Sequence, residues 1–119
     1  MFSTTDTIVA IATPPGRGAL GIVRLSGPDS STIVLRLLGR KSVLEPRRAT
    51  FGCLTTGTLQ DQVVVTFFPS PRSYTGDDVV EICSHGSDVV LREILRAAVE
   101  AGARLAAPGE FTLRAYVNG

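Results

Sequence analysis

The stretch from Pro14 to Gly27 constrains this chain most, because it joins two short apolar runs through a turn. The runs cover residues 8–12 and 20–25, and two prolines and two glycines stand between them. Proline fixes φ at about −65°, and glycine tolerates positive φ and close backbone approach. The pattern therefore predicts two strands with a tight connection.

The same stretch contains Gly16-x-Gly18-x-x-Gly21, the glycine spacing of a dinucleotide-binding loop. That loop functions only between a strand and a helix whose N-terminus receives a pyrophosphate. Here the last glycine opens the short, β-branched run 22–25, which residues 26–28 (Ser-Gly-Pro) bring to an end. We therefore interpret the glycines as part of a strand–turn–strand unit and not as a nucleotide site.

Composition narrows the class of protein. With 119 residues, 44% apolar and 19% charged, the chain fits one ordinary globular domain. Its net charge of +1 gives no indication of nucleic-acid binding. Cys53 and Cys83 lack the spacing of a disulfide framework or a zinc site, which favours a reducing, cytoplasmic compartment. No apolar run approaches the ~20 residues that span a membrane, and residues 1–6 do not resemble a signal peptide.

Hydrophobic periodicity predicts an alternation of strands and helices. Strands are expected at Thr7–Thr13, Leu20–Leu25, Ala49–Thr56, Gln62–Phe68, Val79–Cys83 and Arg104–Ala107. Helices are expected from a Ser26 cap (with Asp29 in a capping box) to Gly39, at Asp88–Ala101 and at Glu110–Val117. The third and fourth strands, joined by the turn residues 56–61, should pair antiparallel. The order predicts an α+β fold in which helices pack on a mixed, largely antiparallel sheet.

Three positions stand out as candidate functional residues. The irregular, proline-containing segment 69–77 carries Tyr74. Glu81 lies in the middle of an apolar strand, where it must either reach solvent or meet a partner, because an unpaired buried carboxylate is costly. His85 is interpreted as a turn residue, since no serine or cysteine nucleophile accompanies it in a recognisable motif.

Four ordered blocks of sequence resemble the N-terminal domain of the MnmE/TrmE family of tRNA modification GTPases. They are Thr7-Ile8-Val9-Ala10 through Ala12-Thr13-Pro14-Pro15-Gly16-Arg17-Gly18 to Ile22-Val23-Arg24-Leu25-Ser26-Gly27; Ser73-Tyr74-Thr75-Gly76-Asp77-Asp78; Glu81 through His85-Gly86; and Pro108-Gly109-Glu110-Phe111-Thr112 with Arg114-Ala115. Together they cover nearly the whole chain, residues 1–119, as one domain.

The resemblance implies a domain that binds 5-formyl-tetrahydrofolate, dimerises, and has a fold similar to that of the glycine-cleavage aminomethyltransferases. By position, the folate contacts fall on Arg24 and Glu81, with the Tyr74 loop lining the site and a further lysine expected just after Gly119. It also implies modification of a tRNA wobble uridine together with a flavoprotein partner. GTP, Mg²⁺ and K⁺ would belong to a GTPase domain outside these residues, which contain no GxxxxGK[ST] segment. No catalytic or metal-binding residue is expected here.

Two other functions remain open from the sequence: a stand-alone folate-dependent one-carbon transferase, and a purely structural dimerisation domain. Against the first, the chain has no recognisable catalytic carboxylate pair, metal cluster or activated nucleophile. Against the second, Arg24, Glu81 and the Tyr74 loop suit a heterocycle that carries carboxylates. A homodimer is expected, because the aminomethyltransferases are thought to build one folate site from two such halves.

Overall fold

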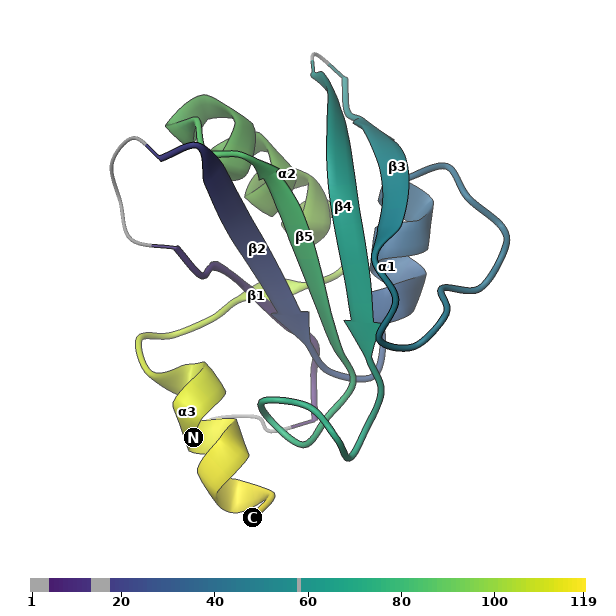
Figure 1. The fold of residues 1–119 in the computed structure, drawn as a ribbon. Coiled ribbons are helices and arrows are strands. Elements are labelled where there is room, and N and C mark those ends of the chain that lie inside the picture. Colours follow the sequence, from purple (N-terminus) through teal and green to yellow (C-terminus); the bar gives the residue numbers. More distant parts are fainter. Residues whose placement is uncertain (1–4, 14–17, 58) are drawn as a thin grey trace.

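The computed structural model describes residues 5–13, 18–57 and 59–119 as a single six-stranded sheet with three helices (Figure 1). The strands are β1 (Ile8–Ile11), β2 (Leu20–Ser26), β3 (Thr50–Thr55), β4 (Gln60–Phe68), β5 (Val79–His85) and β6 (Arg104–Leu105). The helices are α1 (Ser30–Leu37), α2 (Asp88–Glu100) and α3 (Glu110–Val117). The strand order is β3-β4-β5-β2-β1-β6; β1 and β6 are parallel and the other neighbours are antiparallel. The α+β prediction is confirmed.

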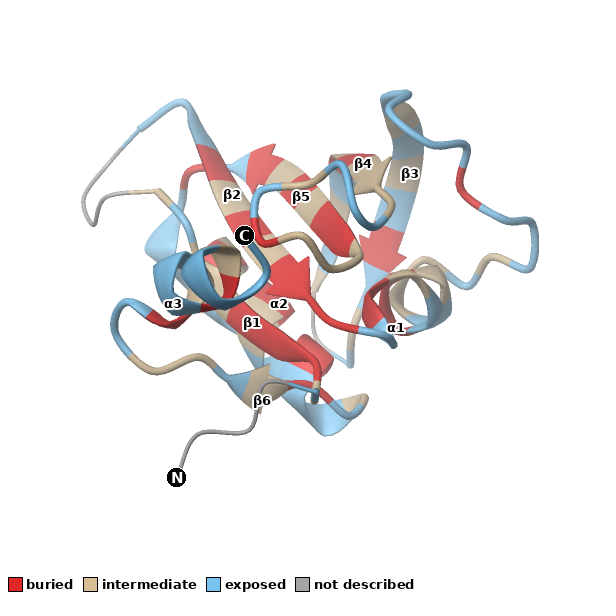
Figure 2. Ribbon diagram, turned by 90° about the horizontal axis from the view of Figure 1, so that it is seen from below, coloured by how far each residue is buried: buried red, intermediate tan, exposed pale blue. Residues whose placement is uncertain are grey.

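One face of this sheet forms the hydrophobic core. In β2 and β5 the inward residues alternate with outward ones, as a half-buried strand requires. Val23, Leu25, Val80 and Ile82 are completely buried and belong to the same cluster as Ile94 of α2. Figure 1 shows α1 and α2 on this side of the sheet, and Figure 2 shows the buried residues striping the central strands. Helix α3 lies apart from them, at the end of the sheet where β1 begins and β2 ends (Figure 1).

Two predicted boundaries, the start of the first helix and the end of the fifth strand, are wrong. Ser26 does not cap α1: it is the last residue of β2, buried, with its Oγ 2.7 Å from Thr75 Oγ1. Helix α1 begins one turn later, with Asp29 at its N-cap. The strand continues to Ser26 because it still has a partner there, Val79 of β5. His85 likewise is the final residue of β5 and not part of the turn that follows.

The glycine-rich connection can be judged only from its flanks, since Pro14 to Arg17 lie outside the described residues. Gly21 lies within β2, which pairs antiparallel with β1. The strand–strand interpretation holds for these flanks, and no helix follows the last glycine of the fingerprint. Within the described ranges, no helix is long and apolar enough to cross a membrane.

Candidate functional site

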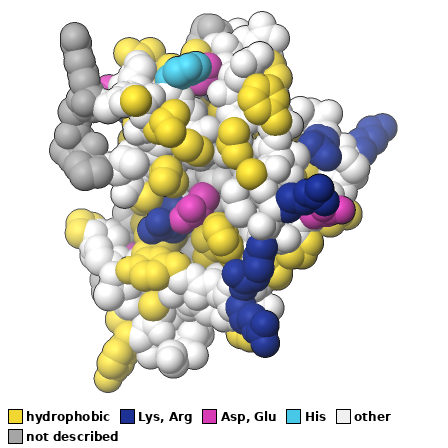
Figure 3. Space-filling model, in the orientation of Figure 1, with side chains coloured by type: hydrophobic (Ala, Val, Ile, Leu, Met, Phe, Trp, Pro, Cys, Tyr) yellow, Lys and Arg dark blue, Asp and Glu magenta, His cyan; other side chains and the backbone are white. Residues whose placement is uncertain are grey.

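Arg24 and Glu81 form an ion pair in the middle of the sheet, on the face that α1 and α2 leave open. They are direct neighbours in the β2–β5 register, and both strand positions alternate with core residues. Arg24 Nε donates to Glu81 Oε2 at 2.8 Å, and Arg24 Nη2 lies 2.8 Å from the same oxygen. Each side chain is 26% exposed. Figure 3, in the orientation of Figure 1, shows the open face of the sheet, where charged side chains stand among apolar ones.

Tyr74 lies beside this pair. The Arg24 guanidinium carbon is 5.2 Å from the centre of the Tyr74 ring, the distance of a cation–π contact. The Tyr74 hydroxyl lies 2.9 Å from Thr112 Oγ1 of α3, and the next residue, Thr75, is buried against Ser26. The structure thus brings together all three residues assigned to the site from the sequence, from two strands and one loop.

A pocket of about 380 Å³ opens next to them. Arg24 and Tyr74 line it, together with two β1 residues and the continuous segment 106–112. Its volume is within the range of small-molecule sites, roughly 300–1,000 Å³. Glu81 is not part of the lining but holds Arg24 from the neighbouring strand. The lining of the pocket by residues 106–112 was not predicted from the sequence. The block Pro108–Thr112, which resembles the family, was a signal that could have revealed it.

A buried ionic cluster fixes the 106–112 wall in place. Glu110, at the start of α3, accepts from Arg104 Nη2 at 2.6 Å, from Arg104 Nη1 at 3.0 Å and from the Ala107 N–H at 2.8 Å. Arg114, one turn on in α3, donates to Asp6 Oδ1 and to the Asp6 carbonyl, each at 2.6 Å. The side chains of Glu110 and Arg114 are each only 1% exposed. The cluster therefore ties α3 to β6 and to the residues before β1.

These contacts determine the electrostatics of the wall. Hydrogen bonds from Arg104 lower the pKa of Glu110 and of Asp6, and burial opposes this only in part. The same two carboxylates raise the pKa of Arg104. Asp6, Glu110 and Arg104 are therefore charged at neutral pH.

Comparison with known proteins decides the family. The family model for the "GTP-binding protein TrmE N-terminus" matches residues 7–119. This chain belongs to that family.

Curated relatives agree with the TrmE match. The proteins named "tRNA modification GTPase MnmE" from Legionella pneumophila (strain Corby) and Thermotoga sp. (strain RQ2) are 56% and 52% identical to it over 115 residues, which is 95% and 96% of this chain. The protein of that name from Saccharophagus degradans is 49% identical over 117 residues. The chain spans about a quarter of the length of these relatives: 26%, 26% and 25%.

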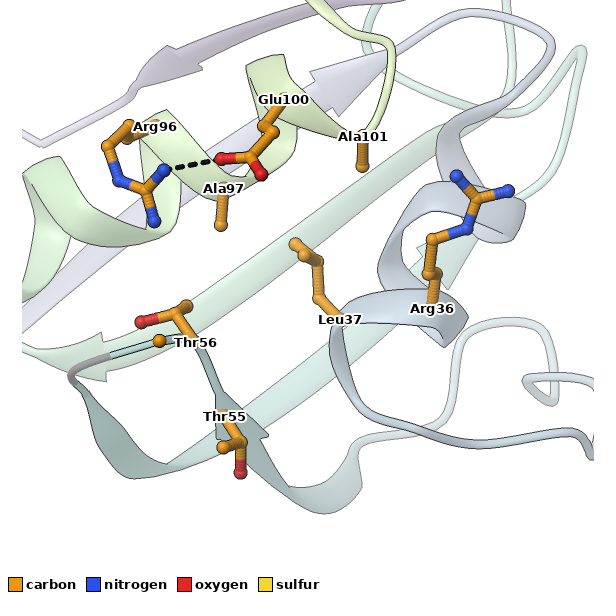
Figure 4. A pocket seen from close by; sticks show the side chains of 9 residues that line it. Arg36, Leu37, Thr55, Thr56, Arg96, Ala97, Glu100 and Ala101 are labelled. Carbon is orange, nitrogen blue, oxygen red and sulfur yellow. Dashed lines mark hydrogen bonds and ion pairs between the residues drawn. The ribbon is translucent and has the colours of Figure 1, made fainter.

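Other hollows of this TrmE-family chain lie elsewhere, of which one, of about 610 Å³, opens beside the start of α2. Another, of about 270 Å³, opens between α1, α2 and the end of β3 (Figure 4). Its cation Arg96 forms ion pairs with Glu100, at 2.5 Å, and with Glu93. A third contains His85, whose Nδ1 lies 3.0 Å from Asp61 Oδ1. Within the described residues, no group of His, Cys, Asp and Glu is arranged to hold a metal ion.

Proposed function

We propose that this chain is the folate-binding and dimerisation domain of a cytoplasmic tRNA modification GTPase, and that it binds 5-formyl-tetrahydrofolate beside Arg24, Glu81 and Tyr74. The observation that carries the proposal is the Arg24–Glu81 pair on the open sheet face, next to a pocket of about 380 Å³ that Arg24 and Tyr74 line. The names of the relatives support tRNA modification as the process.

The side chains suit the parts of a reduced folate. The pterin ring presents an amino group and a ring N–H side by side, both donors, and an ionised carboxylate such as Glu81 accepts both at once. Arg24 offers planar, forked donors to a carbonyl or carboxylate. Tyr74 supplies an aromatic surface that is half exposed, at 52%. In the free chain Arg24 and Glu81 satisfy each other, so the ligand replaces a bond that already exists.

Pairing with a second copy belongs to the proposal. Helices α1 and α2 pack on the other face of the sheet, and apolar residues stand exposed on the open face: Phe51 of the edge strand β3 is 66% exposed and Leu20 of β2 is 64% exposed. A two-fold axis would bury the same patch on both copies. GTP hydrolysis, the flavoprotein partner and contact with the wobble uridine are proposed for the whole protein, of which the chain covers about a quarter. Sedimentation at tens of micromolar tests the dimer, and a purely monomeric boundary would contradict it.

Glu81→Gln tests the folate site. The substitution keeps the size of the side chain but turns one acceptor into a donor that faces a ligand donor. We expect affinity for 5-formyl-tetrahydrofolate to fall about 30- to 1,000-fold, or roughly 2–4 kcal/mol, with little change in melting temperature. Calorimetry on a chain extended through the lysine expected after Gly119 measures this.

Glu45→Gln is the matched control. Glu45 also pairs with an arginine, Arg48, at 2.9 Å, but both side chains are largely exposed and lie in the connection between α1 and β3. Its removal should leave folate affinity unchanged. Equal affinity of the Glu81→Gln variant and the unaltered chain would rule out the assigned site.

A further inference from the structure

Cationic side chains are concentrated on two connections of the fold. We define the basic rim as the cations of residues 39–49, between α1 and β3, and of residues 69–73, after β4: Arg40, Lys41, Arg47, Arg48 and Arg72. Glu45 is the single acid in these two segments. Figure 3 shows blue side chains gathered on the side of the molecule where Figure 1 places α1, β3 and their long connection.

The net charge of the whole chain conceals this rim. Twelve cations and eleven acids give +1, but five of the cations and only one of the acids belong to the rim segments. The rest of the chain is therefore acidic overall. Charge distribution, and not the total, decides where a polyanion can bind.

The rim is held rigidly against the sheet. Leu44, in the middle of the first segment, is 2% exposed and anchors it in the core. Pro46 forms an isolated bridge with Phe67 of β4, and the Arg47 N–H donates to the Phe67 carbonyl at 2.7 Å. Arg47 adopts a left-handed backbone, φ 61°, which is unusual for a side chain other than glycine, asparagine or aspartate. Arg47 is thus presented on backbone that is bound to β4.

Arg47 joins the two segments. Its guanidinium donates to the carbonyl of Arg72 and lies 5.8 Å from the centre of the Phe68 ring. Neither Arg47 nor Arg72 forms an ion pair with a described residue, so these two residues meet without a neutralising acid. Arg48 has Glu45, but that pair is 75% and 66% exposed and is only weakly held.

We propose that the basic rim binds the phosphate backbone of tRNA; this rests on the proposed role of the chain in tRNA modification. Four of the five cations are arginines, whose planar fork matches phosphate oxygens. Arg72 is two residues from Tyr74 in the same loop, so this loop connects the rim with the candidate folate site. RNA on the rim lies beside that site.

The experiment compares two double variants of equal net charge. Arg47→Gln/Arg72→Gln removes two rim cations; Arg36→Gln/Arg92→Gln removes two exposed helix cations that form no ion pair within the described residues. Binding of an unmodified tRNA transcript is measured by fluorescence anisotropy at about 50 and about 200 mM KCl. Raising the KCl concentration should increase the Kd for tRNA. Because the rim variant lacks two phosphate contacts, this increase should be about tenfold smaller in it than in the unaltered chain. The control variant should show the same increase as the unaltered chain.

Further arms keep the test decisive. Arg40→Gln/Lys41→Gln changes the two cations at the start of the first segment, where Arg40 Nε donates only locally, to Ser42 Oγ; it should keep the fold and also weaken tRNA binding. Arg47→Lys/Arg72→Lys should retain the salt dependence. Equal losses in the rim and control variants, no tRNA binding at low salt, or binding only to phosphatidylserine vesicles would overturn the proposal. The affinity of the unaltered chain for 5-formyl-tetrahydrofolate is measured in parallel. If this chain binds tRNA but no folate, the result counts against the folate site and not against the rim.

Discussion

Replacing Arg114 with methionine should destabilise the chain strongly, because Arg114 is the largest fully buried side chain among the described residues. Methionine has a similar length but no donors. The variant leaves the carbonyls of Asp6 and Ser26 without the Nη1 group that lies 2.6 and 3.4 Å from them, and Glu110 loses a cation 3.6 Å away. Removing one member of a buried ionic group costs about 3–5 kcal/mol.

The lower end of that range is expected here. Asp6 is 36% exposed, so water can replace part of what its carboxylate loses, and Glu110 keeps both of its bonds to Arg104. A loss of about 3 kcal/mol corresponds to a fall in melting temperature of roughly 12 °C for a domain of this size. Urea denaturation with an unchanged m-value would measure the free energy of unfolding directly.

Arg96→Met is the control that separates burial from charge pairing. Arg96 also has two carboxylate partners, Glu93 and Glu100, yet it lies on the exposed face of α2 with its side chain 53% exposed. Solvent and salt screen such pairs, so its removal should change the melting temperature little. Equal, small effects of Arg114→Met and Arg96→Met would refute the view that the buried cluster holds α3.

Three other perturbations test separate contacts. Because the pKa of Glu110 is lowered in the folded chain, its ionised form stabilises the fold at neutral pH; the difference in stability between the chain and Glu110→Gln should be constant above about pH 5 and shrink below about pH 4.3 in pH-dependent melts. Ser26→Ala leaves the buried Thr75 hydroxyl without its 2.7 Å partner and should lower the free energy of unfolding by about 1–3 kcal/mol in urea titrations. Gly86→Ala would place a methyl group 2.2 Å from the Gly18 carbonyl oxygen, so circular dichroism melts should reveal a loss of about 1–3 kcal/mol.

The order of the elements was predictable from the sequence because the signals are local. β-Branched runs mark the central strands, and apolar residues at helical spacing mark α1 and α2. The cap of α1 was not predictable in this way. Ser26 has the right chemistry for a cap, but a strand partner in β5, more than fifty residues away, keeps it extended.

The site was predictable in part. Resemblance to a family pointed to Arg24, Glu81 and the Tyr74 loop, but no local pattern reveals that Arg24 and Glu81 are neighbours across two strands. The ionic cluster was missed because arginine and glutamate are rarely buried completely. The spacing of Glu110 and Arg114, one helical turn apart, was the only local hint.

The position of the β1–β2 hairpin between β5 and β6 has a consequence for how the chain acquires its structure during synthesis. Ile8 pairs with Ser26 at once, but its other neighbour, Arg104, lies 96 positions further along the chain. At typical ribosomal speeds of about 5–20 residues per second, that neighbour arrives roughly 5–20 s later. Until then the β1 edge of the hairpin has unpaired backbone groups, whereas the β2 edge gains its partner β5 earlier; an unpaired edge can pair with a wrong strand. The pocket wall from residues 106–112 is translated after every strand of the described sheet, so a nascent chain can bind ligand at this site only after the whole sheet has left the ribosome.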